Sequence, residues 1–146
     1  MPGAWRIFAD FAPAGGEGLT LGADVTVPGR VSVTEKEHTT TAQVEGGYTV
    51  TLTGDPAAGS SSDVTVSVER DGEPVTDLEP YLGAFGHLVA LRAGDLAYLH
   101  VHPEESDAGP EVPFVAEVPS AGDFHLYFDF QHDGVVRTCG VLRAGG

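Results

Sequence analysis

Apolar and polar residues alternate along most of this chain, and this alternation constrains its fold more than any other feature. Successive side chains of a β-strand point to opposite faces, so the pattern is typical of strands with one buried face. No apolar pattern with the 3.6-residue period of a helix persists for more than about two turns. The alternating segments are Val25–Val33, Tyr48–Leu52, Val64–Val68, His87–Leu91, Leu96–His102, Val112–Val118, Phe124–Phe130 and Val135–Val141.

Turn signals rich in glycine, proline and aspartate separate these segments, as at Gly46-Gly47, Asp71-Gly72 and Asp133-Gly134. A length of 146 residues suits one domain with one core. We therefore predict an all-β fold, an antiparallel Ig-like β-sandwich, with Ig-like and jelly-roll connections both open. The one helical element that we expect is a single turn at Asp77–Leu82.

The chain contains an internal likeness between two aromatic segments. Trp5–Phe11 and Phe124–Phe130 share an aromatic-x-aliphatic-aromatic-x-Asp-Phe pattern, and each continues through a glycine-containing turn into another strand. Chance similarity of two amphipathic strands would produce this likeness, and so would descent from a repeated unit. On the second view, residues 1–29 form a β-hairpin left from an upstream repeat, and residues 30–146 form the sandwich. Such a hairpin needs a sheet edge, so it would either dock on the main domain of its own chain or pair with a second copy, which would make a homodimer through the hairpin.

Charge and composition narrow the classes of partner. The chain has 22 acidic and 7 basic residues, for a formal charge of −15, which disfavours nucleic-acid binding. No run approaches the roughly 20 apolar residues of a membrane span. The N-terminus shows no basic segment followed by an apolar one, so the sequence predicts no secretory signal. Cys139 is the only cysteine, and we expect it to be a small buried side chain in the last strand.

Histidines gather at the open end of a predicted hairpin. His100 and His102 are two residues apart on one strand and so share a face. A connection with an even number of residues would put His87, on the preceding strand, on that face as well. His132 follows the strand Phe124–Phe130 in a turn and is a fourth candidate. Neutral imidazoles suit Cu(II) or Zn(II), so these four residues are the predicted metal ligands.

The same four histidines would equally suit an inert polar strand end, with imidazoles hydrogen-bonded to Tyr81, Tyr98 or aspartates. Met1 is the only methionine, which argues against a thioether site for Cu(I), and Cys139 lies outside any histidine-rich loop, which argues against blue copper. We expect His38 and His125 to be exposed. No motif of a known enzyme class is present, so we predict no catalytic residue and no enzymatic activity.

The segments Leu78–Gly83, Gly86–Val89 and His100–Pro103, with the turn Gln131–Gly134, resemble a group of exported or envelope-associated bacterial proteins. These are described as heavy-metal-binding or YtkA-like and have Ig-like sandwich domains akin to periplasmic copper-resistance proteins. The resemblance covers about residues 60–143 and implies His87, His100 and His102 as ligands, with His132 as a fourth. It also implies a location in the cell envelope or outside the cell.

These observations predict a non-enzymatic module of a bacterial envelope protein that binds a divalent metal, copper before zinc. The alternative is a structural or protein-interaction Ig-like module with no metal site. The two hypotheses differ in whether the rings of His87, His100 and His102 share a centre.

Overall fold

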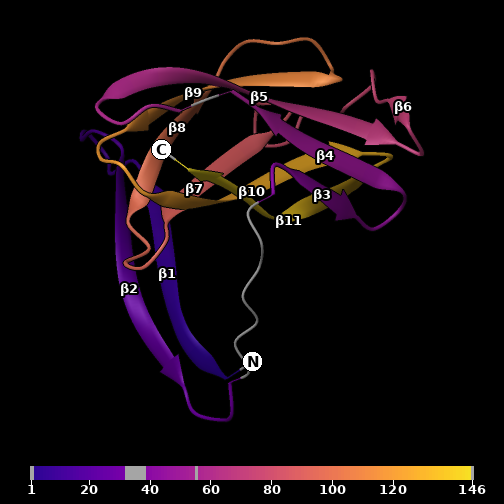
Figure 1. The fold of residues 1–146 in the computed structure, drawn as a ribbon. Coiled ribbons are helices and arrows are strands. Elements are labelled where there is room, and N and C mark those ends of the chain that lie inside the picture. Colours follow the sequence, from indigo (N-terminus) through magenta and orange to yellow (C-terminus); the bar gives the residue numbers. More distant parts are fainter. Residues whose placement is uncertain (1, 32–38, 55, 146) are drawn as a thin grey trace. The chain divides into compact units, whose positions relative to one another are not determined.

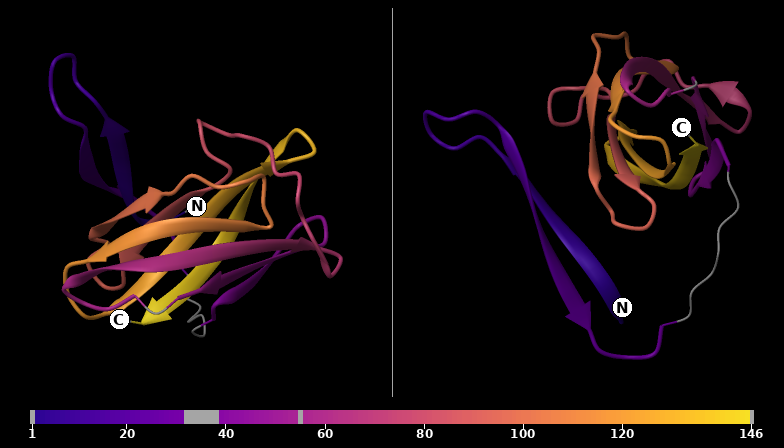
Figure 2. Two further views of the ribbon diagram at one scale, coloured as in Figure 1. Left: turned by 90° about the horizontal axis from the view of Figure 1, so that it is seen from above. Right: turned by 60° about the vertical axis from the view of Figure 1, so that its left-hand side comes forward.

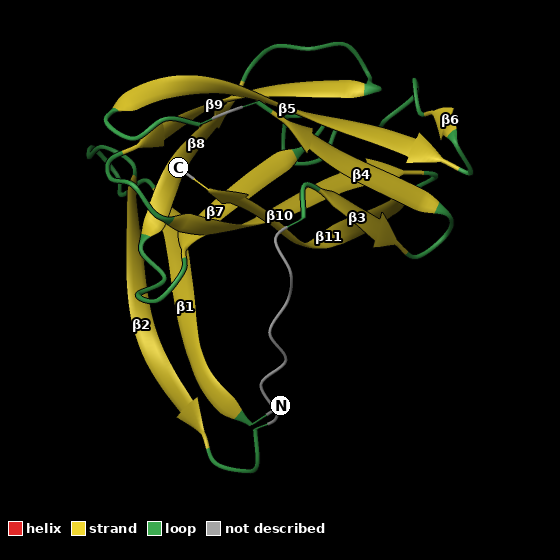
Figure 3. Cartoon of the chain, viewed as in Figure 1, coloured by secondary structure: helices red, strands yellow, loops and turns green. Residues whose placement is uncertain are grey.

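The computed structural model describes residues 2–31, 39–54 and 56–145, and the side chains of His100 and of residues 140–145 lie outside the description. The regular elements of the described residues are all strands, so the predicted all-β class is confirmed (Figure 3). The chain divides into two compact units, Met1–Lys36 and Glu37–Gly146. None of the described residues belongs to a helix long and apolar enough to span a membrane.

The first unit is a β-hairpin, as predicted. Strands β1 (Gly3–Phe11) and β2 (Leu19–Val27) pair antiparallel over their whole length. Of the predicted strand Val25–Val33, only Val25–Val27 lies in a strand, because β2 begins at Leu19 and ends before Pro28, which has no backbone N–H to donate. Residues 32 and 33 lie outside the described residues. His38 lies outside the described residues.

The second unit is an antiparallel sandwich. One sheet runs in the order β11-β10-β7-β8-β9-β5-β4-β3, with β6 paired to β5, and folds over into two layers (Figures 1 and 2). Its strands are β3 (Thr41–Val44), β4 (Tyr48–Thr53), β5 (Ser60–Arg70), β6 (Glu73–Pro74), β7 (His87–Arg92), β8 (Tyr98–Pro103), β9 (Glu111–Val118), β10 (Asp123–His132) and β11 (Val135–Gly145). The predicted sandwich is confirmed.

Alternation along the strands builds the core between the layers. In β10 every second residue is buried, from Phe124 to His132, and β9 repeats this pattern. The largest fully buried side chains include Tyr48, Phe114, Phe128 and Phe130. The rings of Phe128 and Phe130 stack with centroids 5.7 Å apart, and Phe114 meets Phe128 edge-on at 6.1 Å. These contacts fix the orientation of both layers, and with them the direction of every outward-facing side chain.

The predicted helical turn at Asp77–Leu82 is wrong. The backbone there is extended: Glu79 bridges to Gln131, and Tyr81 pairs with Ala84 across a tight turn. Leu82 and Gly83 both have positive φ, 49° and 89°, so the turn reverses the chain instead of continuing a helix. Pro80, which lacks an N–H, also disfavours a helix at this point.

Cys139 lies on β11 opposite Phe128 and is fully buried, as expected. Burial disfavours the charged thiolate and raises the pKa of this thiol to about 11. We predict that a disulfide reagent such as DTNB leaves the native protein unlabelled at pH 8 and reacts with one thiol after denaturation in guanidinium. Fast labelling of the native protein would contradict the buried placement.

Candidate functional site

The register of the β7–β8 hairpin confirms one part of the histidine prediction. Leu91 pairs with Tyr98 and Ala90 with Leu99, so odd positions of β7 share a face with even positions of β8. Leu88, Ala90 and Leu99 face the core. The backbone positions of His87, His100 and His102 therefore belong to the outward face of the sheet.

The two strands do not stay together as far as the histidines. Their pairing extends no further than Ala90–Leu99, and from His100 onward β8 pairs with β9 instead, so that β7 and β8 diverge (Figure 1). A continuous ladder would have set His87 directly opposite His102. The sequence thus predicted the shared face correctly, but the shared face alone does not bring the rings together.

His87 is held by the tight turn that precedes it. Its Nε2 lies 2.7 Å from the carbonyl oxygen of Tyr81, and the two rings meet edge-on with centroids 5.7 Å apart. A carbonyl oxygen only accepts, so Nε2 carries the hydrogen and donates it. Nδ1 of the neutral ring then keeps its lone pair, which makes it the atom of His87 able to bind a cation or accept a proton.

Asp129 is a polar residue of the same face that the sequence interpretation missed. It stands opposite His87 in the β10–β7 ladder, and its Oδ1 is buried without a hydrogen-bond partner among the described residues. A buried carboxylate oxygen without a partner is rare in proteins, and a bound ion is one way to satisfy it. The equivalent position of the similar segment Trp5–Phe11 is Asp10, which accepts a hydrogen bond from Thr20 at 3.2 Å. The shared aspartate of the two segments was the available signal for Asp129.

His132 is set in a buried hydrogen-bond network at one end of the sandwich. Its Nδ1 lies 2.7 Å from the hydroxyl of Tyr48, and its Nε2 lies 3.1 Å from Oδ1 of Asp77. The carboxylate accepts from Nε2–H, so in the neutral ring the buried Tyr48 hydroxyl donates to Nδ1. Metal ligation by His132 would have to break one of these two bonds.

Two arginines enclose the ring of Tyr48 in this network. The guanidinium carbons of Arg137 and Arg70 lie 4.5 Å and 5.1 Å from its centroid, within cation–π range. Arg137 also donates to the carbonyl of His132 at 2.6 Å, and Arg70 pairs with Asp133 at 2.7 Å. Both guanidinium groups thus already donate to acceptors within the protein, which indicates that the two arginines stabilise the fold.

His100, His102 and His125 lie on the strands of the same sheet. His102 is exposed on β8, and His100 contributes a backbone paired with Glu117, its side chain lying outside the description. His125, predicted to be exposed, is half-buried on β10. Among the side chains that the structure describes, no three from His, Cys, Asp and Glu stand together as a metal-holding group. A centre that includes His100 falls outside that statement.

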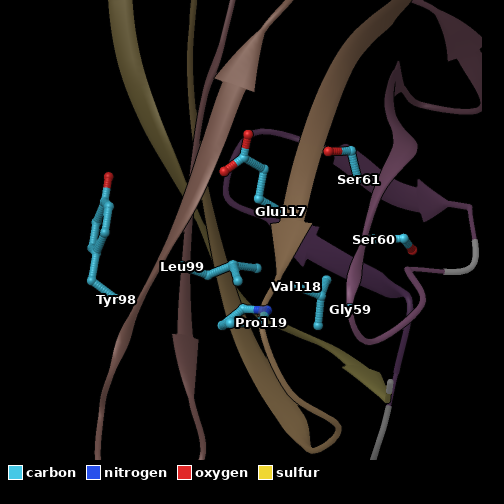
Figure 4. A pocket seen from close by; sticks show the side chains of 8 residues that line it. All are labelled: Gly59, Ser60, Ser61, Tyr98, Leu99, Glu117, Val118 and Pro119. Carbon is cyan, nitrogen blue, oxygen red and sulfur yellow. The ribbon is translucent and has the colours of Figure 1, made fainter.

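A shallow pocket of about 450 Å³ opens beside the same strands. It is lined by Gly59, Ser60, Ser61, Tyr98, Leu99, Glu117, Val118 and Pro119, and Figure 4 shows the apolar side chains between Tyr98 and the serines. Glu117 is its one carboxylate, and no histidine, cysteine or basic residue is among these described lining residues.

Comparison with known proteins identifies a family. A family model described as a domain of unknown function (DUF8832) matches residues 41–143, and the chain belongs to this family. No curated protein and no solved structure matches the chain. The matched range covers nearly the whole sandwich unit and includes all four predicted ligands.

The network at His132 predicts a stability effect. Tyr48→Phe removes the hydroxyl and leaves Nδ1 of a buried ring without its donor, so we expect a loss of about 1–3 kcal/mol in the free energy of unfolding. Urea denaturation followed by circular dichroism measures it. Tyr127→Phe, on the outward face of β10, is the matched control and should change stability by less than about 0.5 kcal/mol. Equal effects of both substitutions would refute a structural role for the Tyr48–His132 bond.

Proposed function

We propose that this member of the DUF8832 family is a non-enzymatic module that binds a divalent metal ion, copper before zinc, on the outward face of β7 and β8. His87, His100 and His102 are the proposed ligands. The observation that carries the proposal is the hydrogen bond from Nε2 of His87 to the Tyr81 carbonyl. Metal-binding histidines nearly always donate their second ring N–H to a carbonyl or carboxylate in this way, which orients the ring and fixes the tautomer.

The carboxylate oxygen Oδ1 of Asp129 supports the same location. Asp129 is the cross-strand neighbour of His87 on that face, and its Oδ1 is buried without a hydrogen bond among the described residues. A cation bound near His87 would offset this charge. The donor set would then combine imidazole nitrogens with a carboxylate, which suits Zn(II) and Cu(II).

The charge of the sandwich unit also favours a cation. Residues 37–146 contain 18 acidic and 4 basic residues, so they carry −14 of the formal charge. A field of this sign raises the local concentration of metal ions around the whole unit without selecting among them. Selectivity must come from the imidazoles, because carboxylates alone favour calcium or magnesium. The resemblance of the His87–Pro103 region to envelope heavy-metal-binding proteins agrees with a bacterial envelope role.

The second candidate function is a structural or protein-interaction module with no metal site. The divergence of β7 and β8 beyond Ala90–Leu99 favours it, because the backbone does not bring His87 and His102 opposite one another. On this view His87 supports the Tyr81 turn, as His132 supports Asp77 earlier in the same connection between β6 and β7. The two candidates make different predictions for metal titration.

Titration calorimetry with Cu(II) and with Zn(II) tests the proposal. We expect the wild type to bind one ion, and His100→Ala combined with His102→Ala to bind it at least about 100-fold more weakly, since two ligands are lost. His125→Ala, a histidine of the same sheet outside the proposed set, is the matched control and should bind like the wild type. An absence of binding by the wild type, or equal binding by all three proteins, would support the structural module instead.

Asp129 gives an independent test with two readouts. Asp129→Asn removes the charge of a half-buried carboxylate whose Oδ1 has no hydrogen-bond partner among the described residues, so the metal-free protein should gain about 1 kcal/mol in unfolding free energy. Its metal affinity should fall at least about tenfold, because a neutral amide replaces the carboxylate of the proposed donor set. Asp63→Asn, at an exposed position of β5, should change neither quantity. Lower stability of the metal-free Asp129→Asn protein would show that the carboxylate serves a structural bond.

A further inference from the structure

The β1–β2 hairpin has one face made only of apolar residues. In the register that pairs Trp5 with Val25 and Phe11 with Leu19, the odd positions of both strands share a face. Its members are Gly3, Trp5, Ile7, Ala9, Phe11, Leu19, Leu21, Ala23, Val25 and Val27. The opposite face is mixed and contains the ion pair of Arg6 with Asp24 at 3.1 Å. The hairpin is thus strongly amphipathic.

The apolar face is exposed. Ile7 and Leu21 keep 59% and 58% of their surface accessible, and Trp5 keeps 43%. A lone two-stranded hairpin is marginally stable in water, because one layer cannot bury its own apolar side chains. A partner surface is therefore needed to stabilise this element.

Among the described residues, the sandwich unit presents no comparable apolar surface. Its large apolar side chains that are exposed in this part of the chain are Leu82, Val135 and Val136. The inner faces of its two layers already cover each other. The best match for the hairpin face on this chain is the hairpin face of another copy.

The likeness to β10 indicates how such a face is normally covered. Trp5, Ile7, Ala9 and Phe11 align with Phe124, Leu126, Phe128 and Phe130 of β10, all of which are buried against the facing layer of the sandwich. The hairpin therefore carries the side-chain pattern of an inner sandwich face, which packs on a second sheet about 10 Å away.

We propose that two copies of this chain associate through their β1–β2 hairpins, apolar face against apolar face, as a four-stranded two-layer sandwich with two-fold symmetry. The seven large exposed side chains of the face would supply about 600 Å² per copy, taking roughly 150–250 Å² for a full side chain. The pair would bury about 1,200 Å², at the lower limit of stable interfaces.

The distribution of charge favours the hairpin as the contact. Residues 1–36 contain four acidic and three basic residues, a formal charge of −1, whereas the chain as a whole carries −15. Two copies repel each other through their sandwich units but hardly through their hairpins. Apolar contact between two copies is therefore opposed by the least charge repulsion when it is made through the hairpins.

The test uses the full chain in EDTA, so that a metal-bridged dimer does not contribute. Sedimentation equilibrium over a wide concentration range gives the mass, and Trp5, the only tryptophan, reports burial of the face through its fluorescence. We expect a monomer–dimer equilibrium in which Trp5 emission shifts to the blue as the dimer forms.

Ile7→Glu and Leu21→Glu each place a charge on the apolar face, and each should raise the dimer dissociation constant by about 100-fold or more, because the dimer would bury unpaired carboxylates. Thr26→Glu, on the opposite face of the hairpin, is the matched control and should dimerise like the wild type. A dimer that resists both face variants would place the contact elsewhere and overturn the proposal. A monomer at all concentrations would also overturn it: blue emission would then mean docking within the chain, and red emission would mean no self-association.

Discussion

The contact between the ring of Phe128 and the backbone at Gly86 links the core of the sandwich to its candidate site. Phe128 is fully buried and held by Phe114 and Phe130. A Cβ at Gly86 would overlap the Phe128 ring, so only glycine lets the chain lie this close. The next residue, His87, opens β7 and faces outward. The direction of this imidazole therefore follows from how the aromatic core is packed.

Several hydrogen bonds hold the connection between β6 and β7, and three of them involve a histidine or the turn that follows β10. Asp77 bonds His132, Glu79 accepts from the backbone N–H of Gly134 at 3.0 Å, and the Tyr81 carbonyl accepts from His87. This segment is irregular yet well supported, because its polar groups find partners on β10 and the turn that follows it. The same connection thus contributes to the buried network around His132 and orients the ring of His87, whose Nδ1 keeps its lone pair.

Alternation and turn signals were enough to predict the sandwich and the shared face of the histidines, because these depend on local period alone. The N-terminal hairpin was predicted from the likeness of Trp5–Phe11 to Phe124–Phe130. What local period does not contain is where a strand changes partner. At His100, β8 stops pairing with β7 and pairs with β9, and this change depends on the tertiary structure. It separates His87 from His102, which strand alternation had placed on the same face. The pairing of His132 with Tyr48, 84 positions away, is equally non-local. Asp129 could have been found from the likeness of the two aromatic segments, since Asp10 occupies the equivalent position.

Almost all of the negative charge lies in the sandwich unit, whereas the exposed apolar face lies in the hairpin unit. The chain therefore resembles an amphiphile whose two parts are whole structural units. The sandwich unit, at −14, acts as an ionic headgroup, and the nearly neutral hairpin with its exposed aromatic and aliphatic side chains acts as the tail. Amphiphiles with charged heads respond to salt: screening shortens the reach of head-group repulsion from about 10 Å at 0.1 M to about 3 Å at 1 M, while apolar attraction persists. If the hairpins associate as proposed, ionic strength controls the strength of that association independently of any ligand.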